Sequence, residues 1–218
     1  MSRDTDAPPK RDIVHVRERA VHWVLGRCDA PRRELTHIAE RWVEDMVTRE
    51  LGLRWRGIDR GSGGEKPRLR GLDADFSVSH SGDVLLVAVG AGDGIGADVE
   101  AAPFTAFDSR ALRRRMCSPA EAARSESLDS LARRRWLAPT WTAKEAAAKA
   151  TGEGLGLDFR TLEVSATPAP DDAEAVCHIA VADASGIVAI PLILRSAGSV
   201  LTGSPLTVRT VTEPRLAS

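Results

Sequence analysis

The chain has 218 residues, of which 43% are hydrophobic and 28% charged, a composition typical of globular proteins. Its 30 Lys and Arg residues nearly balance its 31 Asp and Glu residues, so the formal net charge is -1. This balance excludes a general electrostatic attraction to nucleic acid or to a membrane surface, and any basic site must be local.

The cysteines and the N-terminal segment indicate the compartment. Cys28, Cys117 and Cys177 are odd in number and far apart, which argues against a disulfide framework and a zinc knuckle and favours a reducing compartment. Residues 1–12, MSRDTDAPPKRD, are polar, and no apolar run approaches the ~18 residues of a membrane span. We therefore expect a cytoplasmic protein with a disordered arm at 1–12 and no signal peptide or membrane helix.

Two helices are predicted after this arm. Apolar residues recur at helical spacing over 12–28 and again over 31–51. Pro31 suits the first turn of the second helix, and Gly52 suits its end. The glycine-rich segment 60–66, RGSGGEK, is a predicted loop without Walker spacing, so we do not interpret it as a nucleotide-phosphate loop.

Three strands are predicted next. Residues 74–81, ADFSVSHS, alternate apolar and polar, which indicates a strand with one buried face. Residues 84–90, VLLVAVG, are continuously apolar, as in a strand buried on both faces. After a turn, residues 95–100 return as a third strand, which carries Asp98 and Glu100 near its end.

Helical signals then dominate the chain. Residues 108–116 are rich in arginine and helical in pattern, and 118–121, Ser-Pro-Ala-Glu, form a capping box with proline at the first helical position. A second basic helical stretch covers 128–136. These arginine clusters could form a docking surface for an acidic protein, or they could be solvated helix faces.

The strongest helix signal is TWTAKEAAAKATGEGLG, which follows Pro139. Thr142 and Glu145 can form a capping box, alanine fills the interior and Gly152 ends the helix. Strands are then predicted at 158–166, 175–183, 187–195 and 205–212. The order of helices, sheet, helices and sheet indicates an α+β fold, whose two halves could be copies of one plan.

The chemistry begins with two carboxylates. Asp98 and Glu100 stand at positions i and i+2 of a predicted strand, so they share a face with Cα atoms roughly 6–7 Å apart. A divalent cation would relieve their repulsion, and an all-oxygen ligand set favours Mg²⁺ over Zn²⁺. Taken alone, the pair is better interpreted as a solvated acidic strand end.

A second cluster lies on the alanine-rich helix. Glu145 and Lys149 are four residues apart and share a face, with Trp141 one turn earlier and Lys144 turned about 100° away. As a surface ion pair, Glu145 and Lys149 would contribute roughly 0.3–0.5 kcal/mol. Because alanine surrounds them, we expect the helix to pack closely, and a metal and a phosphate would then supply their partners.

The third group is Ser79-His80-Ser81 at the end of its strand. No acidic residue adjoins it, so a hydrolase triad has no support. Hydroxyl and imidazole groups make good phosphate contacts, and Lys66 and Arg68 add positive charge upstream. The alternative is that these are strand-end hydroxyls and a surface histidine.

In this order, the segments EKPRL, FSVSHS, GADVE and WTAKEAAAKATGEGLG resemble the 4'-phosphopantetheinyl transferase superfamily. The likeness covers about residues 65–155, includes MCSPAEAA between the carboxylate motifs, and departs from the family's Gly-Lys-Pro at Glu65. The length is similar to that of the two-lobed, surfactin-synthetase-activating type. That resemblance implies two similar α+β lobes in pseudo-twofold arrangement, each a small mostly antiparallel sheet packed with helices: an N-terminal lobe at 13–105 and a C-terminal lobe at 106–218, with the site between them.

The resemblance also implies roles for the residues. It implies a Mg²⁺ site at Asp98, Glu100 and Glu145. Coenzyme A would be held by Lys66, Ser79, His80, Lys144 and Lys149, with Arg32, Arg33 and Arg41 as candidates for its 3'-phosphate. Glu145 is the first choice and Glu100 the second for the group that activates the attacking serine.

The implied reaction is Mg²⁺-dependent transfer of 4'-phosphopantetheine from coenzyme A to a serine of an apo acyl or peptidyl carrier protein of polyketide or nonribosomal peptide synthases, releasing 3',5'-ADP. We expect a monomer that binds neither nucleic acid nor membrane. Two alternatives stay open: a Mg²⁺-dependent phosphohydrolase of coenzyme A-like substrates, and a non-catalytic coenzyme A-binding relative.

Overall fold

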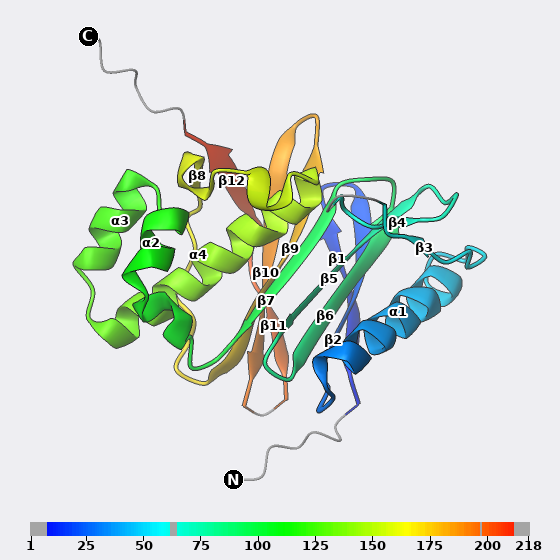
Figure 1. The fold of residues 1–218 in the computed structure, drawn as a ribbon, viewed down its shortest axis with the longest axis horizontal. Helices are drawn as coiled ribbons and strands as arrows, with labels where there is room; N and C mark the ends of the chain where they lie inside the picture. Colours follow the sequence, from blue (N-terminus) through cyan, green and yellow to red (C-terminus); the bar gives the residue numbers. More distant parts are fainter. Residues whose placement is uncertain (1–7, 62–64, 197, 212–218) are drawn as a thin grey trace.

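The computed structural model describes residues 8–61, 65–196 and 198–211, and Figure 1 shows its fold. The first antiparallel sheet has the strand order β1-β2-β6-β5. Its strands are β1 (Lys10–Val16), β2 (Arg19–Arg27), β5 (Ala74–Ser81) and β6 (Val84–Ala91). A separate short pair joins β3 (Ile58–Asp59) to β4 (Arg68–Leu69).

The second sheet has the order β7-β9-β10-β12-β8, with β11 paired to β10. Its strands are β7 (Ile95–Ala101), β8 (Leu162–Glu163), β9 (Ala173–Asp183), β10 (Gly186–Arg195), β11 (Val200–Thr202) and β12 (Leu206–Thr210). The helices are α1 (Arg32–Arg49), α2 (Arg110–Met116), α3 (Pro119–Glu126) and α4 (Ser130–Thr151). Short 3-10 helices are η1 (Thr105–Asp108), η2 (Gly154–Gly156) and η3 (Phe159–Thr161). The predicted α+β class is confirmed.

Apolar clusters explain how the layers stack. One cluster fills the space between the inner faces of the two sheets and includes Leu86 of β6, Val99 of β7 and Cys177 of β9. The long helices cover the outer faces: α1 packs on β6, and α4 packs on β7 and β9. Figure 1 shows β5 and β7 side by side between α1 and α4.

The helix predicted over 12–28 is wrong, because this segment forms the β1–β2 hairpin. The residues buried between the sheets follow the two-residue period of strands, and they are Val14, Val16, Val21, Trp23 and Leu25, while Val24 is buried on the opposite face. β1 begins at Lys10, so the end of the arm predicted at 1–12 is also strand, while residues 1–7 lie outside the described part.

The break predicted at Pro139 is also wrong. α4 runs without interruption from Ser130 to Thr151, and Thr142 lies inside it instead of capping it. A proline leaves the carbonyl four residues earlier without its helical partner. Here that carbonyl, on Arg135, accepts a hydrogen bond from the Ala169 N–H at 2.8 Å, so the helix continues.

The other predicted elements mostly agree with the structure. The helix at 31–51, the strands within 74–100 and the strands at 175–183 and 187–195 are present, and the Ser118–Glu121 capping box is formed. Segment 158–166 differs, since it contains η3 and only two residues of strand. No helix in the described ranges is long and apolar enough to span a membrane.

Strand β7 links the two predicted lobes. It falls within the predicted N-terminal lobe, yet it is hydrogen-bonded to β9 of the second sheet. Arg27 of β2 adds a second link, since its guanidinium pairs with Asp83 at 2.6 Å and with Glu174 at 2.7 Å. The two sheets are therefore held together along β7.

Candidate active site

The junction between β5 and β7, hereafter the β5–β7 junction, is bridged by side chains. Alternate residues of β5 accept hydrogen bonds from successive outward N–H groups of β7. The bonds are Ile95 N to Asp75 Oδ2 (2.8 Å), Ala97 N to Ser77 Oγ (2.8 Å) and Val99 N to Ser79 Oγ (3.3 Å). On this edge of β7, which pairs with none of the described strands, these three N–H groups are thus hydrogen-bonded to side chains instead of to a neighbouring backbone.

The same junction orients the two carboxylates of β7. Ser79 Oγ donates to Asp98 Oδ1 at 2.7 Å, and Ser81 Oγ donates to Glu100 Oε2 at 2.8 Å. Ser79 is buried and its hydroxyl holds Asp98, while its contact with phosphate stays a prediction. Sequence analysis treated Ser81 only as a strand-end hydroxyl or phosphate contact and did not single out Ser77, although a polar residue at every second position of a strand was the available signal.

Helix α4 brings the other half of the site. Lys149 Nζ donates to Asp98 Oδ1 at 2.7 Å and to the Ala97 carbonyl at 3.0 Å. Between Ala138 and Ala150 the helix is buried except at Trp141, Glu145 and Lys149, which are half-buried. Their four-residue spacing places them on one stripe, as predicted, and that stripe borders the carboxylates of β7.

Electrostatics tie the three carboxylates together. Burial and, next, the charge of Asp98 raise the pKa of Glu145 to about 7, against the opposing effect of Lys149 and Arg115. Burial also raises the pKa of Glu100, whereas hydrogen bonds from Ser81 and the Trp141 indole oppose that rise. The three acids therefore repel one another within one partly desolvated region.

This donor set fits a hard cation. Asp98 Oδ2 is buried and has no hydrogen-bond partner, whereas Oδ1 is paired with Lys149, so one strong acceptor of this carboxylate lacks a donor. Carboxylate oxygens are the ligands that Mg²⁺ prefers. In the described parts of the chain, no group of three or more His, Cys, Asp or Glu side chains is arranged so that it could hold a metal ion, so the proposed ligands would have to move together to bind one.

Lys144 lies elsewhere, and its role as a phosphate ligand stays a prediction. The side chain is fully buried, and Nζ forms an ion pair with Glu121. It also donates to the carbonyls of Met116 at 2.8 Å and Phe159 at 2.9 Å. All three donors of the ammonium are thus used inside the protein, where they join α4 to α3 and η3.

Lys66 and His80 lie on different sides of β5. Lys66 forms an ion pair with Asp75 and donates to the Ile95 carbonyl at 2.6 Å, and burial lowers its pKa. His80 is exposed and lines a cavity of about 260 Å³ between α1 and β5, together with Arg32. The other two arginines of α1 considered above, Arg33 and Arg41, do not line this cavity.

A histidine that sequence analysis overlooked lies under α4. His178 of β9 is fully buried, and its Nδ1 lies 2.7 Å from Thr142 Oγ1. Burial lowers the pKa of His178 to about 3. In the register of β7 and β9 it stands directly opposite Asp98, a pairing that only the sheet could reveal.

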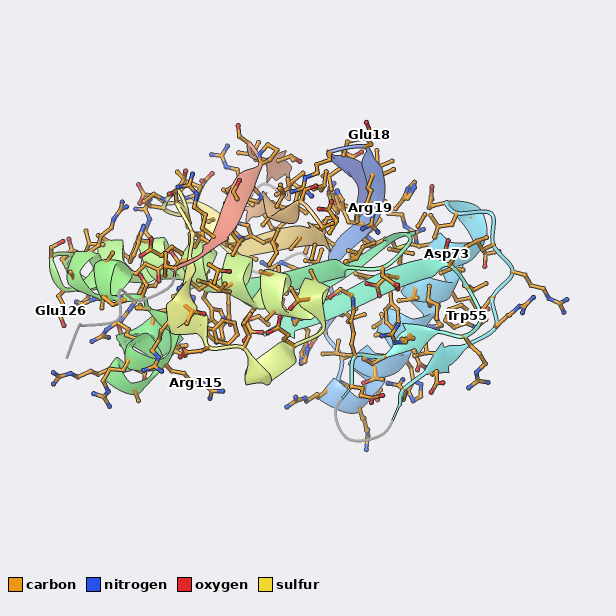
Figure 2. All side chains as sticks on the ribbon, turned by 90° about the horizontal axis from the view of Figure 1, so that it is seen from above. Glu18, Arg19, Trp55, Asp73, Arg115 and Glu126 are labelled. Carbon is orange, nitrogen blue, oxygen red and sulfur yellow. The ribbon has the colours of Figure 1, made fainter. Side chains whose placement is uncertain are left out.

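The largest cavity described, of about 1030 Å³, lies away from the carboxylates beside α2, α3 and η3. Its lining includes Arg110, Arg113 and Arg114. Figure 2 shows Arg115 projecting at the surface of α2, and its charge also acts on Glu145. A basic surface thus adjoins the site. By contrast, Arg134 is paired with Asp108.

Arg135 is likewise occupied, by an ion pair with Asp171. The basic stretch at 128–136 is therefore less available than α2 for docking an acidic protein.

Comparison with known proteins finds a family that matches the segment carrying these residues. Residues 94–182 match the family model described as the 4'-phosphopantetheinyl transferase superfamily, whereas no curated protein matches the chain. The matched segment runs from the turn before β7 to β9, so it contains both carboxylate motifs and α4. Over residues 94–182 the chain is therefore similar to the 4'-phosphopantetheinyl transferase superfamily.

Proposed function

We propose that this protein transfers 4'-phosphopantetheine from coenzyme A to a serine of an apo carrier protein, with Mg²⁺ as the metal. The observation that carries the proposal is the meeting of β7 and α4, where Asp98, Glu100, Glu145 and Lys149 form one partly buried group. The match of residues 94–182 to the superfamily model supports phosphopantetheine transfer in general.

The residues divide into two roles. Asp98, Glu100 and Glu145 are the proposed Mg²⁺ ligands, and the bound ion would supply positive charge to the pyrophosphate of coenzyme A. Lys149 uses two of its three N–H donors on Asp98 and Ala97, which leaves one to contact a phosphate oxygen.

The chemical step needs a base and a leaving group. The carrier serine oxygen attacks the β-phosphorus, the bond to 3',5'-ADP breaks, and the serine proton passes to a carboxylate. Glu145, whose pKa in the metal-free protein is raised to about 7, is the first candidate to accept that proton. Glu100 is engaged by Ser81 and Trp141, so it is better suited to binding than to proton transfer.

The cavity between α1 and β5 is the proposed place for the nucleotide end of coenzyme A. His80 and Arg32 line it and offer donors and positive charge. Lys66, on the other side of β5, would reach the pyrophosphate only by exchanging part of its contact with Asp75.

The carrier protein is proposed to dock on α2. Arg110 and Arg114 are exposed there, and the adjoining Arg115 acts on Glu145, so a basic surface leads to the proposed base. Acidic carriers would complement this charge. We further propose the two-lobed type, in which a monomer in the cytoplasm activates polyketide or nonribosomal peptide synthases.

Mass spectrometry of the carrier tests the proposal. The protein is incubated with coenzyme A, Mg²⁺ and a panel of apo carrier domains, and each carrier should gain the mass of one phosphopantetheine group. A matched panel in which the carrier serine is replaced by alanine should gain nothing. Cleavage of coenzyme A without any carrier would favour a phosphohydrolase, and coenzyme A binding without turnover would favour a non-catalytic relative.

A further inference from the structure

The β5–β7 junction is closed covalently at one end only. Strands β5 and β7 run in the same direction, since each β7 N–H that bonds to β5 meets a residue twenty positions earlier. Where the two strands begin, the turn at 92–94 joins β7 to β6, the neighbour of β5. Where they end, hereafter the open end, β5 turns back into β6, whereas β7 leads away to η1 and α2. Noncovalent contacts must therefore hold the open end together.

The side-chain hydrogen bonds of the junction lengthen towards the open end. The N–H groups of Ile95 and Ala97 lie 2.8 Å from their acceptors on β5, whereas Val99 N lies 3.3 Å from Ser79 Oγ. The next contact joins two side chains, those of Ser81 and Glu100. Hydrogen bonds longer than about 3.2 Å are weak, so the open end is the weaker end of the junction, and it carries Glu100.

Arg27 spans the open end. Its guanidinium Nη1 donates to both carboxylate oxygens of Asp83, at 2.7 and 2.6 Å, and Nη2 donates to Glu174 Oε2 at 2.7 Å. Asp83 belongs to the turn that follows β5, and Glu174 is the second residue of β9, which pairs with β7. The Arg27 side chain is only 12% exposed, so these charge-assisted bonds are largely shielded from solvent.

Backbone contacts place both acids of this cluster. The Asp83 carbonyl accepts from Cys28 N at 2.7 Å, which fastens the turn to the end of β2 within the first sheet. The Glu174 carbonyl accepts from Ala102 N at 2.8 Å, one residue beyond β7. Of the bonds that Arg27 makes, the one to Glu174 therefore crosses from the first sheet to the second.

We propose that Arg27 is a positioning residue that fixes the spacing of β5 and β7 at the open end. The turn that it holds begins directly after Ser81, and the strand that it holds pairs with the end of β7. Loss of this tie would therefore move Ser81 away from Glu100. A displacement of about 1 Å at a reacting group can cost about 10²-fold in rate. The inference rests on the proposed function only for its effect on transfer.

Amide hydrogen exchange tests the tie without coenzyme A or metal. Arg27→Gln removes the charge and should raise the ratio of the Val99 to the Ile95 exchange rate about 10-fold. This ratio cancels any change in global stability. Arg19→Gln is the matched control, because Arg19 lies at the other end of β2 and donates to the Asp93 carbonyl at 2.6 Å, beside the covalent turn. An unchanged ratio in Arg27→Gln, or an equal rise in Arg19→Gln, would overturn the inference.

A double-variant cycle separates a tie from two independent contacts. Glu174→Gln weakens the bond that crosses the sheets and should raise the same ratio about as much as Arg27→Gln. The combined variant should raise it no further, because either change alone already breaks the tie. Additive effects of the two substitutions would contradict a single tie through Arg27.

Transfer kinetics connect the tie to the proposed function. With coenzyme A, Mg²⁺ and an apo carrier, Arg27→Gln should lower kcat about 10-fold. The KM for the carrier should stay as in wild type, since no residue of α2 is changed. Equal kcat values for Arg27→Gln and wild type would overturn the positioning role. If the wild type modifies no carrier, the proposed function fails, and the exchange ratio still decides whether Arg27 ties the sheets.

Discussion

Gly96 lies directly beneath the backbone of Ala146, so that strand β7 and helix α4 meet without an intervening side chain. A Cβ atom at Gly96 would overlap the Ala146 carbonyl oxygen and lie 2.6 Å from the Ala150 nitrogen. Both obstacles are main-chain atoms of a buried helix, which cannot move aside cheaply. This close approach is what carries Lys149 to Asp98.

Gly96→Ala should therefore separate α4 from β7. Overpacking a tight core typically costs about 1–3 kcal/mol, and we expect the upper end here because the clash is with backbone. Urea unfolding should show the loss in the free energy of unfolding. Gly156→Ala is the matched control, since a Cβ there meets nothing within 4 Å. Equal stability of the two variants would contradict the close contact.

Asp98→Asn should abolish Mg²⁺-dependent transfer while the fold persists. The amide keeps the shape of the side chain but removes the charge that attracts both Lys149 and the cation. We expect a loss in kcat/KM of about 10²–10³-fold, as for removal of one group that stabilises charge. Asp93→Asn, at the exposed turn before β7, controls for loss of an acid nearby. Unchanged turnover in Asp98→Asn would remove this residue from the site.

Lys144→Met should unfold the protein more easily instead of weakening coenzyme A binding. Removing one partner of a buried ion pair typically costs about 3–5 kcal/mol, because the Glu121 charge is left unpaired. Chemical denaturation measures this loss. In the folded fraction, the KM for coenzyme A should stay as in wild type. A large rise in that KM at wild-type stability would restore Lys144 as a phosphate ligand.

The neutral, buried His178 should make stability depend on acid. Burial lowers its folded-state pKa from 6.5 to about 3, so below pH 6.5 the unfolded chain binds a proton that the folded chain refuses. Stability present above pH 6.5 should therefore fall by about 1.4 kcal/mol per pH unit as the pH decreases towards 3. Urea unfolding between pH 7 and 5 measures the slope.

His178→Asn should reduce that slope by about one proton. His80→Asn, at an exposed position of β5, controls for the loss of a histidine as such. If wild type and His178→Asn share one slope, His178 is not held neutral in the folded protein.

Reversing charge on α2 should weaken carrier docking. In the variant Arg110→Glu with Arg114→Glu, we expect the KM for the carrier to rise about 10-fold, while kcat and the KM for coenzyme A stay constant. Long-range attraction is screened by salt, so the difference should shrink at high ionic strength. Arg54→Glu, exposed after α1, is the control. A change in kcat alone would place α2 outside the docking surface.

The sequence alone determined the local features whose signals are short-range. The strand carrying Asp98 and Glu100 and the stripe of Trp141, Glu145 and Lys149 follow from periods of two and of about four residues. The ordered motifs also indicated the superfamily that the family model matches.

Only the tertiary structure decided where lysines and hydroxyls point. Lys144 and Lys149 are five positions apart on one helix, yet one is fully buried against Glu121 and the other reaches Asp98. Ser79 likewise turns to Asp98 because β7 lies along β5, and a phosphate role was inferred without that neighbour.

The long-range pairings had no sequence signal at all. Ala169 satisfies the carbonyl that Pro139 frees, and His178 faces Asp98 across a strand pair eighty residues apart in sequence. Such contacts depend on sheet register and on the packing of α4, which arise only when distant segments share one core. The sequence therefore specified the chemical groups of the site, and the tertiary fold decided which of them meet.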